Sequence, residues 1–510
     1  MNSATRLRRA ARRETFGVDV GAALNLVGAV VKYLSLAFLF PAAVAVGYSE
    51  SPWPFVVSGT AAAAFGFALE YVTRGNDRVG VREGFLIVAL TWLLAAAFGA
   101  LPYLLAEEQL SRPVDAYFES MSGFTTTGAS VVTDLTELSR SMAMWRQFTQ
   151  WLGGMGIIVL ALAVLPRLRV GGRQLFESEL PGPEVETLTA RIRDTARRLW
   201  LLYLALTATE ALALAIIGWT GIDEAMDPYQ AVAHAFTTMP TGGFSPQARS
   251  IETFTAVTQW VIVVFMIVAG VNFALMYRAI VRGSPRVVPR DPEFRLYGVL
   301  LGLASAIIFA DLLGRGIYDG EEAARHAVFQ TASIVTTTGY ASADFTQWTL
   351  LTAVLLVALM FAGGSAGSTA GSVKVVRHLI VGRVLRRELD QTVHPEIVAP
   401  VRLRGAVVDE RTLRAVVAFV LLYVGLFAAG AIGIALDAER VDLGVRPLDA
   451  AGAAATTLGN VGPAFGFAGP MGSFEPFTDP SKGIMIVLMW MGRLEIIPVI
   501  VLFTKRYWRA

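Results

Sequence analysis

Residues 124–130 read FTTTGAS, and the chain returns to this pattern three more times. The block VTTTGYAS stands at 335–342, and looser copies read TMPTGGFS at 238–245 and TLGNVGPAFG at 457–466. Each copy follows a short, moderately apolar segment and lies between two long apolar runs. The copies align on four glycines, Gly128, Gly243, Gly339 and Gly462. The sequence therefore predicts one unit used four times: apolar run, short helix, Thr/Gly loop, apolar run.

The composition is that of a membrane protein. Of the 510 residues, 54% are hydrophobic and 16% are charged, and the mean hydropathy is +0.54. A soluble domain carries about 25% charged residues, and several apolar runs exceed the ~20 residues that cross a bilayer. The absence of cysteine excludes disulfides, zinc–thiolate sites and cysteine nucleophiles. The net charge of +2 gives no indication of a nucleic-acid partner, because the arginines are dispersed among the loops.

Ten apolar runs predict spanning helices, so we expect an all-α polytopic membrane protein. The first run follows an arginine cluster, but it is longer than the ~7–15-residue core of a signal peptide, and we expect it to be retained. Only the eighth run is interrupted. The predicted spans are 22–47, 53–73, 84–106, 142–166, 198–219, 256–281, 296–314, 348–386, 412–435 and 483–505.

Four further segments are too short or too polar to cross the bilayer, and we expect them to be re-entrant pore helices that end at the Thr/Gly loops. They are 113–125, 228–239, 322–335 and 447–457. Non-helical backbone is tolerated at membrane depth only where it is buried in protein or lines a water-filled path. Two spans separate each loop from the next, so the four units point the same way and are expected to surround one pore.

This pattern divides the chain into five predicted parts. Residues 1–80 form an N-terminal transmembrane hairpin outside the repeat. The pore repeats follow at 81–175, 176–290, 291–400 and 401–510.

Lysine and arginine predict the orientation. Most of the 43 basic residues lie in segments that fall on one side of the membrane, namely 1–15, 74–82, 167–198, 278–295, 374–414 and 505–509. The positive-inside rule makes that side cytoplasmic. We therefore expect a multi-pass protein of the cytoplasmic (inner) membrane with both termini in the cytoplasm. Acidic residues in the external segments would raise the local cation concentration, although ordinary solvation also explains them.

The loops suit a dehydrated cation. Rings of backbone carbonyls supply oxygen ligands without a charged side chain in the membrane, and glycine reaches the positive φ that such a loop needs. The preceding helices would direct their negative C-terminal ends at the axis. The predicted ion-binding backbone comprises Thr126, Thr127, Gly128, Thr241, Gly242, Gly243, Thr337, Thr338, Gly339, Asn460, Val461 and Gly462.

Other interpretations of the sequence fit its pattern less well. A single TTTG is an ordinary turn, but four copies at matching places are not explained that way. A coupled solute carrier with broken helices would usually pair inverted halves, which a parallel repeat does not. The chain has no HExxH, no GxSxG and no pair of intramembrane aspartates at catalytic spacing, so we do not expect an enzyme.

The loops and the segments around them resemble the Trk/Ktr potassium-uptake superfamily, TrkH type. The resemblance includes WRQFTQWLGGMGIIVLALAVLP at 145–166, GGRQLFESELPGP at 171–183, FAGGSAGSTAGSVKVVR at 361–377 and GRLEIIPVIVLF at 492–503. It implies potassium uptake through a carbonyl-lined filter. In the superfamily, serine in the first loop goes with sodium passage, so Gly128 implies potassium. The second and fourth loops depart from TTG, and H⁺- or Na⁺-coupled symport on the same scaffold stays open.

Two features predict a gate below the filter. Four glycines break the eighth run within an intramembrane loop at 362–373, which we expect to obstruct the pore, with Lys374 near its end; a flexible linker is the alternative. The last span holds Arg493. The resemblance places this arginine below the filter, where it would restrain cations, whereas a structural salt bridge with Glu495 or Glu210 is equally open. The four glycines are Gly363, Gly364, Gly367 and Gly371.

The resemblance also implies partners. It predicts a homodimer with a pore in each protomer, and a cytosolic TrkA-like regulatory subunit that binds NAD or ATP. The chain itself has no nucleotide-binding fingerprint, so we expect no cofactor here beyond K⁺ as the transported ion. The basic segments 167–198 and 374–414 are candidate docking faces.

A few polar residues in the apolar part of the chain receive structural interpretations. Glu119 is expected to order the first loop, and His234 and His326 are not expected to bind metal. Glu210, Asn272 and Lys32 are expected to act in helix packing.

Overall fold

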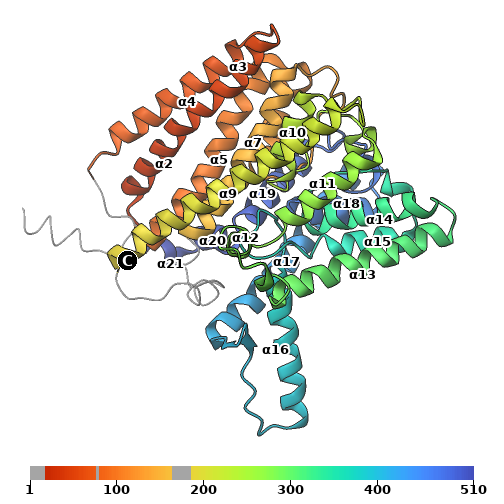
Figure 1. Ribbon diagram of the computed structural model, residues 1–510. Helices are drawn as coiled ribbons and strands as arrows, with labels where there is room; N and C mark the ends of the chain where they lie inside the picture. Colours follow the sequence, from red (N-terminus) through yellow and green to blue (C-terminus); the bar gives the residue numbers. More distant parts are fainter. Residues whose placement is uncertain (1–17, 76–79, 164–184, 510) are drawn as a thin grey trace, which may run out of the picture.

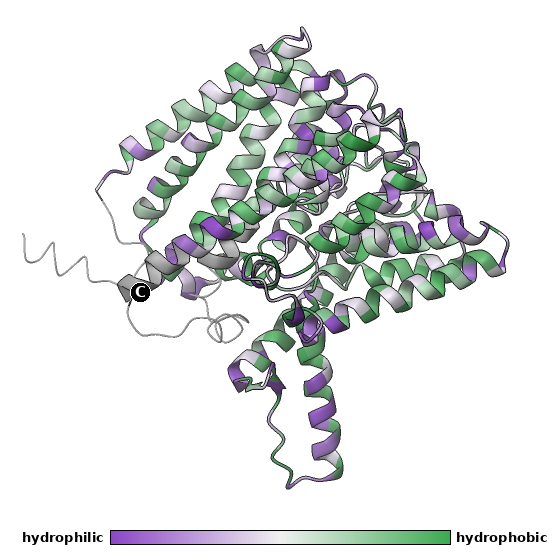
Figure 2. Ribbon diagram, in the orientation of Figure 1, coloured by the Kyte–Doolittle hydropathy of each residue, from purple (hydrophilic) through white to green (hydrophobic). Residues whose placement is uncertain are grey.

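The computed structural model describes residues 18–75, 80–163 and 185–509, with side chains given for 18–75, 80–156 and 194–509. Within these ranges the chain is almost entirely helical (Figure 1). Six helical segments are long and apolar enough to cross a membrane. Figure 2 shows hydrophobic residues along their length, many of them exposed, as lipid-facing side chains are. The six segments are Val20–Gly47 (α2 Val20–Leu34, η1 Ser35–Phe38 and α3 Leu39–Gly47), α4 Trp53–Val72, α5 Val81–Ala106, the Asp194–Trp219 part of α9 Val185–Trp219, α13 Pro292–Gly314 and α17 Glu410–Arg440.

All four predicted pore helices are present, as α6 Pro113–Phe124, α10 Pro228–Thr238, α14 Gly320–Val335 and α18 Pro447–Gly459. Three of them begin with proline, which has no N–H to leave unpaired in the first turn. Nearly every residue in their C-terminal halves is buried. Such short helices are held by the protein around them rather than by lipid.

The second helix of three repeats is broken, where the sequence predicted a break only in the third. In the second repeat, α11 Ala256–Ala269 and α12 Phe273–Ile280 meet at 105°. In the third, α15 Leu350–Leu359 is separated from α16 Val375–Val393 by a buried loop, and in the fourth, α19 Asp479–Arg493 gives way to α20 Ile497–Leu502 and α21 Lys505–Trp508. Only α7 Arg140–Ala163 of the first repeat runs on without interruption in the described part of the chain.

The unpredicted breaks have local causes that hydropathy does not reveal. The side chain of Asn272 accepts hydrogen bonds from Ala274 N at 2.8 Å and Leu275 N at 3.0 Å, and so starts α12 as a new helix. In the fourth repeat Glu495 and Ile496 take positive φ values of 58° and 61°. A β-branched residue such as Ile496 is strained in that conformation. The apolar run at 496–502 therefore does not predict a break at this point.

The helices close into a ring of repeats. Each pore helix packs against the first and second helix of its own repeat. Neighbouring repeats meet through α7 with α10, α11 with α14, α16 with α17, and α19 with α6. The last of these contacts joins the fourth repeat to the first. The N-terminal hairpin α2–α4 lies outside the ring against α5 and α7 (Figure 1).

A carboxylate clamp recurs at one end of every repeat, and the sequence analysis did not find it. In each repeat, a carboxylate after or near the end of the first helix accepts a hydrogen bond from the hydroxyl residue just before the second helix. The pairs are Glu107 with Ser139, Asp223 with Thr255, Asp311 with Thr349, and Asp437 with Thr478. In the last three, a second hydroxyl one turn later also donates: Thr258, Thr352 and Ser481. Glu107 lacks that second donor, and burial raises its pKa to about 7.

On the opposite side, α16 projects away from the bundle (Figure 1), and Figure 2 shows several hydrophilic residues along it. The chain returns through a two-residue antiparallel ladder, β1 Arg402–Leu403 with β2 Ala406–Val407. These are the only strands in the described ranges, and the predicted all-α fold class is confirmed. The remaining short 3₁₀ turns are η2 Glu108–Leu110, η4 Ser250–Thr253, η5 Pro285–Val287, η6 Phe345–Gln347 and η7 Gly466–Ala468.

A buried ion pair joins the ends of the ring. Lys482 on α19 contacts Asp115 on α6 with Nζ 2.6 Å from Oδ1, and the two side chains are 0% and 4% exposed. Breaking one half of a buried pair strands a charge in a medium of low dielectric constant, which costs about 3–5 kcal/mol. This pair therefore fastens the fourth repeat to the first.

Lys482→Met should lower the stability of the detergent-solubilised protein by about 3 kcal/mol, because Asp115 loses its buried partner. The melting temperature measures this, with Lys505→Met as the exposed control. Adding Asp115→Leu should recover most of the loss, since an apolar pair of similar size no longer buries a charge. Equal melting temperatures for wild type and Lys482→Met would refute this role.

Candidate functional site

The four Thr/Gly loops share one backbone conformation. Each pore helix ends in a Schellman turn, in which two successive N–H groups donate back to carbonyls of the last helical turn. In the first loop, Thr126 N bonds Gly123 O at 2.9 Å and Thr127 N bonds Ser122 O at 2.8 Å. The same pair of bonds recurs in the other loops, made by Thr241 and Gly242, Thr337 and Thr338, and Asn460 and Val461.

Each turn places a non-glycine residue in the left-handed region. The φ values are 52° for Thr126, 57° for Thr241, 57° for Thr337 and 54° for Asn460. Two residues later the aligned glycine also has a positive φ, between 78° and 116°. The sequence predicted the glycines but not the left-handed residues before them, which cost about 1 kcal/mol each. Because all four loops adopt this unfavourable conformation, we infer that the fold imposes it.

The aligned glycines close a ring. A Cβ atom added to Gly128 would meet the carbonyl oxygen of Gly242, one on Gly243 that of Thr338, and one on Gly339 that of Val461. A Cβ on Gly462 would lie 2.9 Å from the carbonyl oxygen of Thr127, which returns to the first loop. Each loop thus presents a carbonyl to the glycine of the loop before it. Only glycine permits that approach.

A cavity of about 350 Å³ opens above this ring, and all four aligned glycines line it. Its walls come from the segments that follow the loops, including Ser130, Ser245, Pro463 and Phe474. The carboxylate clamps and the short pore helices lie on the same side of the molecule as this cavity. The cavity is therefore a vestibule that leads to the ring from the side opposite α16.

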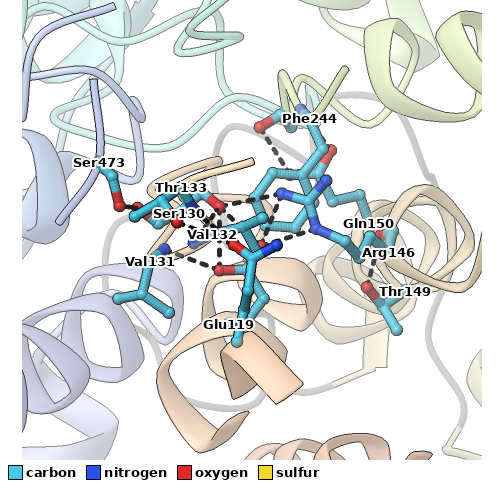
Figure 3. A network of polar contacts seen from close by, with 12 residues as sticks. Glu119, Ser130, Val131, Val132, Thr133, Arg146, Thr149, Gln150, Phe244 and Ser473 are labelled. Atoms are coloured by element: carbon cyan, nitrogen blue, oxygen red, sulfur yellow. Dashed lines mark hydrogen bonds and ion pairs between the residues drawn. The ribbon is translucent and has the colours of Figure 1, made fainter. Parts of the chain in front are cut away.

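A buried network orders the first loop and borders the vestibule (Figure 3). Glu119 on α6 accepts hydrogen bonds from Ser130 Oγ at 3.0 Å and Val131 N at 3.0 Å. The predicted role of Glu119 in ordering this loop is confirmed. Arg146 on α7, which the sequence analysis did not single out, pairs with Glu119 at 2.6 Å, and both side chains are buried.

The charge of Arg146 does not oppose a cation in the vestibule. Its guanidinium lines the cavity, but Glu119 compensates it directly, and the ring of Phe244 lies 4.2 Å from its Cζ. An uncompensated arginine at this place would repel cations from the ring. The pair keeps this wall of the cavity close to neutral.

A loop lies beneath the ring and touches several repeats. This loop, residues 360–374, follows α15 and contains all four predicted gating glycines. Thr369 Oγ1 donates to Met239 O of the second repeat at 2.9 Å, and Gly371 N donates to Thr337 Oγ1 of the third loop at 2.6 Å. A Cβ on Gly371 would meet the carbonyl oxygen of Gly459 in the fourth repeat. The loop is therefore folded and buried against the Thr/Gly loops, and the alternative of a flexible linker is wrong.

The other predicted gating glycines lie in the same buried loop. Gly367 has a φ of +71°. Gly363 lies so close to Gly371 that a Cβ would meet the carbonyl oxygen of Gly371. Gly364 packs against Ala370, and its carbonyl accepts from Val375 N at 3.1 Å. Lys374 follows directly, is buried, and donates from Nζ to Ala370 O. The glycines let the loop fold back on itself in little space.

Arg493 secures this loop to the first repeat. Its Nη1 donates to Thr369 O at 2.9 Å, and its Nη2 donates to Gly153 O at 3.0 Å. The salt-bridge alternatives are wrong: Glu495 pairs with Arg377 instead, and neither carboxylate oxygen of Glu210 has a hydrogen-bond partner within the described residues. Counted from the hydroxyl residue before each second helix, the other repeats have Gly154, Gly270 and Gly364 where the fourth has Arg493. Arg493 is thus the one of these four equivalent positions that has a side chain.

The remaining polar residues have structural partners. His234 contacts Gln230 O and Ser245 Oγ, and His326 contacts Ser342 Oγ. Among the described residues, no group of three His, Cys, Asp or Glu could hold a metal ion. Lys32 pairs with Glu70 at 2.6 Å, which confirms its role in helix packing. Of the candidate docking segment 167–198, residues 167–184 lie outside the described residues, as does the whole motif-bearing stretch 171–183.

The chain is similar to known proteins over nearly its whole length. The sequence model of the TrkH family, described as "Cation transport protein", matches residues 54–509. The Trk system potassium uptake protein TrkH of Vibrio parahaemolyticus is 37% identical over 494 residues, covering 96% of this chain and 99% of that protein. The TrkH protein of Escherichia coli K12 is 36% identical over 493 residues, covering 95% and 98%.

The fold is also similar to that of a solved structure. The crystal structure of the potassium transporter TrkH from Vibrio parahaemolyticus superposes with a TM-score of 0.86 at 35% sequence identity. The match covers 96% of this chain and all of that chain. The likeness therefore extends to the complete arrangement of repeats and is not limited to the loops.

Proposed function

The chain belongs to the TrkH family of cation transport proteins and is a multi-pass membrane protein, and from that premise we propose that it carries potassium into the cell through the ring of four loops. K⁺ would pass from the vestibule, through the ring, and past the loop at 360–374. The relatives reported above are named for potassium uptake. The basic cytoplasmic segments support a location in the inner membrane with both termini inside.

The observation that carries the proposal is the closure of the ring. Each of the four aligned glycines lies against a carbonyl oxygen of the next loop, and the fourth returns to the first. A cation that loses its hydration shell needs oxygen ligands on several sides, and backbone carbonyls provide them without a buried charge. The four pore helices end at the ring, where their C-terminal dipoles add negative potential. Both features favour a cation over an anion.

Closure below the ring would come from the loop and Arg493. The loop is hydrogen-bonded to the second and third repeats, and Arg493 ties it to the first. A buried arginine directly beneath a cation filter adds an electrostatic barrier to the steric one. Opening would require Thr369 and Gly371 to exchange these hydrogen bonds for others. That makes the loop a gate that is closed by default.

The proposal includes partners. A homodimer with one pore in each protomer, and a cytosolic nucleotide-binding subunit acting on the gate, follow from the family resemblance. The projecting α16 continues directly from the gate loop, so force applied to it would reach Lys374 and Gly371 without an intermediary. Control by NAD or ATP would enter through that subunit.

Coupled symport with H⁺ or Na⁺ is the second candidate, and Glu210 favours it. This residue of α9 is fully buried, and no lysine, arginine or histidine forms a salt bridge with its carboxylate within the described chain. Ionisable residues within spanning helices are rare and usually mark an ion or proton pathway. Reversal potentials under crossed K⁺, Na⁺ and pH gradients distinguish a passive pore from a coupled carrier.

Gly339→Ala should abolish most K⁺ uptake while the protein still folds, because the added Cβ would meet the carbonyl oxygen of Val461 and push the third and fourth loops apart. Rubidium or potassium flux into proteoliposomes measures the loss. Gly302→Ala, at an open position on α13, is the matched control and should keep wild-type flux. Undiminished flux in Gly339→Ala would be incompatible with passage through the ring.

Arg493→Ala, or deletion of residues 365–370, should increase K⁺ flux several-fold without changing the preference for K⁺ over Na⁺. Both changes loosen the gate and leave the ring untouched. Single-channel recording and vesicle flux measure the two quantities. If well-folded forms of both variants conduct no faster than wild type, the loop does not limit passage.

A further inference from the structure

The second filter loop lacks the internal bracing that the first and third loops have. In the first loop, the hydroxyl groups of Thr125 and Thr127 lie 2.8 Å apart in a hydrogen bond, and in the third loop those of Thr336 and Thr338 lie 2.7 Å apart. The aligned positions of the second loop are Pro240 and Gly242, which have no hydroxyl groups. This loop cannot hold its own shape in the same way.

Gln150 of the neighbouring repeat fills the missing place. A Cβ added to Gly242 would meet the Cδ and Oε1 atoms of Gln150 and would lie 3.0 Å from its Cβ. The amide therefore occupies the volume that a side chain at position 242 would take. Gln150 lies on α7 and is fully buried, so this contact crosses from the first repeat to the second.

The same amide makes two hydrogen bonds to the backbone of the loop. Its Nε2 donates to Gly242 O at 2.7 Å, and its Oε1 accepts from Phe244 N at 3.1 Å. These two groups flank Gly243, the ring glycine of the second repeat. One side chain thus fixes the backbone on both sides of the residue that faces the third loop.

The repeat itself shows that Gln150 is an exception. Counted along each second helix from the preceding hydroxyl residue, the equivalents of Gln150 are Met266, Met360 and Met489, all buried. By the same repeat, Met266 corresponds to the third loop, Met360 to the fourth and Met489 to the first. Each of these loops has a residue with a side chain just before its aligned glycine, namely Thr338, Val461 and Thr127. Gln150, the one glutamine among these four positions, contacts the second loop, which alone has a glycine, Gly242, before its aligned glycine. The two departures from the repeat compensate each other in volume.

We propose that Gln150 is a positioning residue of the ion filter, which replaces the side chain that Gly242 lacks and holds the second loop at the spacing required for K⁺. This rests on the proposed function. Potassium and sodium differ in size by a fraction of an ångström, so a filter loop free to shift relaxes the discrimination between them. The two buried hydrogen bonds stabilise the loop by about 1 kcal/mol each, and we expect their loss to lower the preference about tenfold.

The test is a reciprocal swap that makes the second repeat resemble the third. Gln150→Met alone should lower the K⁺/Na⁺ flux ratio in proteoliposomes by about tenfold. Gly242→Thr alone should reduce flux, because the new side chain has no room beside Gln150. The double variant should recover a large part of the wild-type ratio. Gln150→Glu, which keeps the size and the acceptor of the amide but loses the N–H donor to Gly242 O, should also lower the ratio.

Gln147→Met is the matched control. Gln147 lies one turn earlier on α7 and is buried, and neither atom of its amide has a hydrogen-bond partner in the described part of the chain. The ratio should stay within about twofold of wild type in this variant. Size-exclusion profiles and melting temperatures establish that all variants are folded.

A second readout is independent of transport. Hydrogen exchange of the amides in residues 241–247 should be faster in Gln150→Met than in wild type, with residues 337–342 unchanged. Unaltered exchange, or an unaltered K⁺/Na⁺ ratio in a wild type that prefers K⁺, would overturn the assignment to Gln150. A wild type without K⁺ flux but with the predicted change in exchange would leave Gln150 positioning the loop and refute the proposed function instead.

Discussion

Peptide groups that leave helical geometry inside a membrane must find hydrogen-bond partners in the protein, and this structure depends on meeting that condition at four loops. The Schellman turns return two N–H groups of each loop to its own pore helix. The glycines then admit a carbonyl of the next loop, so that four turns close into one ring. The carboxylate clamps and the Lys482–Asp115 pair fix the helices that hold the ring.

Function enters where the repeats differ from one another. Arg493 stands where the other repeats have glycine, and Gln150 stands where they have methionine. Among the described residues, a long buried loop interrupts the second helix of the third repeat alone, at 360–374. In the proposed function, the fourfold ring would set a common geometry for an ion, and these single departures would provide a barrier, a brace and a gate. Side chains can therefore differ from one repeat to the next while the backbone of the ring stays in place.

Hydropathy and the repeated TTTG pattern predicted the spans, the pore helices, the parallel orientation and the aligned glycines. They did not predict the breaks at Asn272 and Ile496, because capping and positive φ at a β-branched residue leave no trace in hydropathy. Arg146 and Gln150 were missed since each lies within an apolar helix and gains its role only from a neighbouring loop. The clamps had a readable signal, a hydroxyl residue repeated three positions apart at the start of three second helices, which was overlooked.

The central claim is that the four glycines bound a single site for a dehydrated cation. Anomalous diffraction from crystals of the wild-type protein soaked in rubidium tests it most directly. We predict rubidium density on the axis enclosed by Gly128, Gly243, Gly339 and Gly462, below the vestibule. Rubidium bound elsewhere in the protein with the ring empty, or loops too far apart to share an ion, would contradict the account.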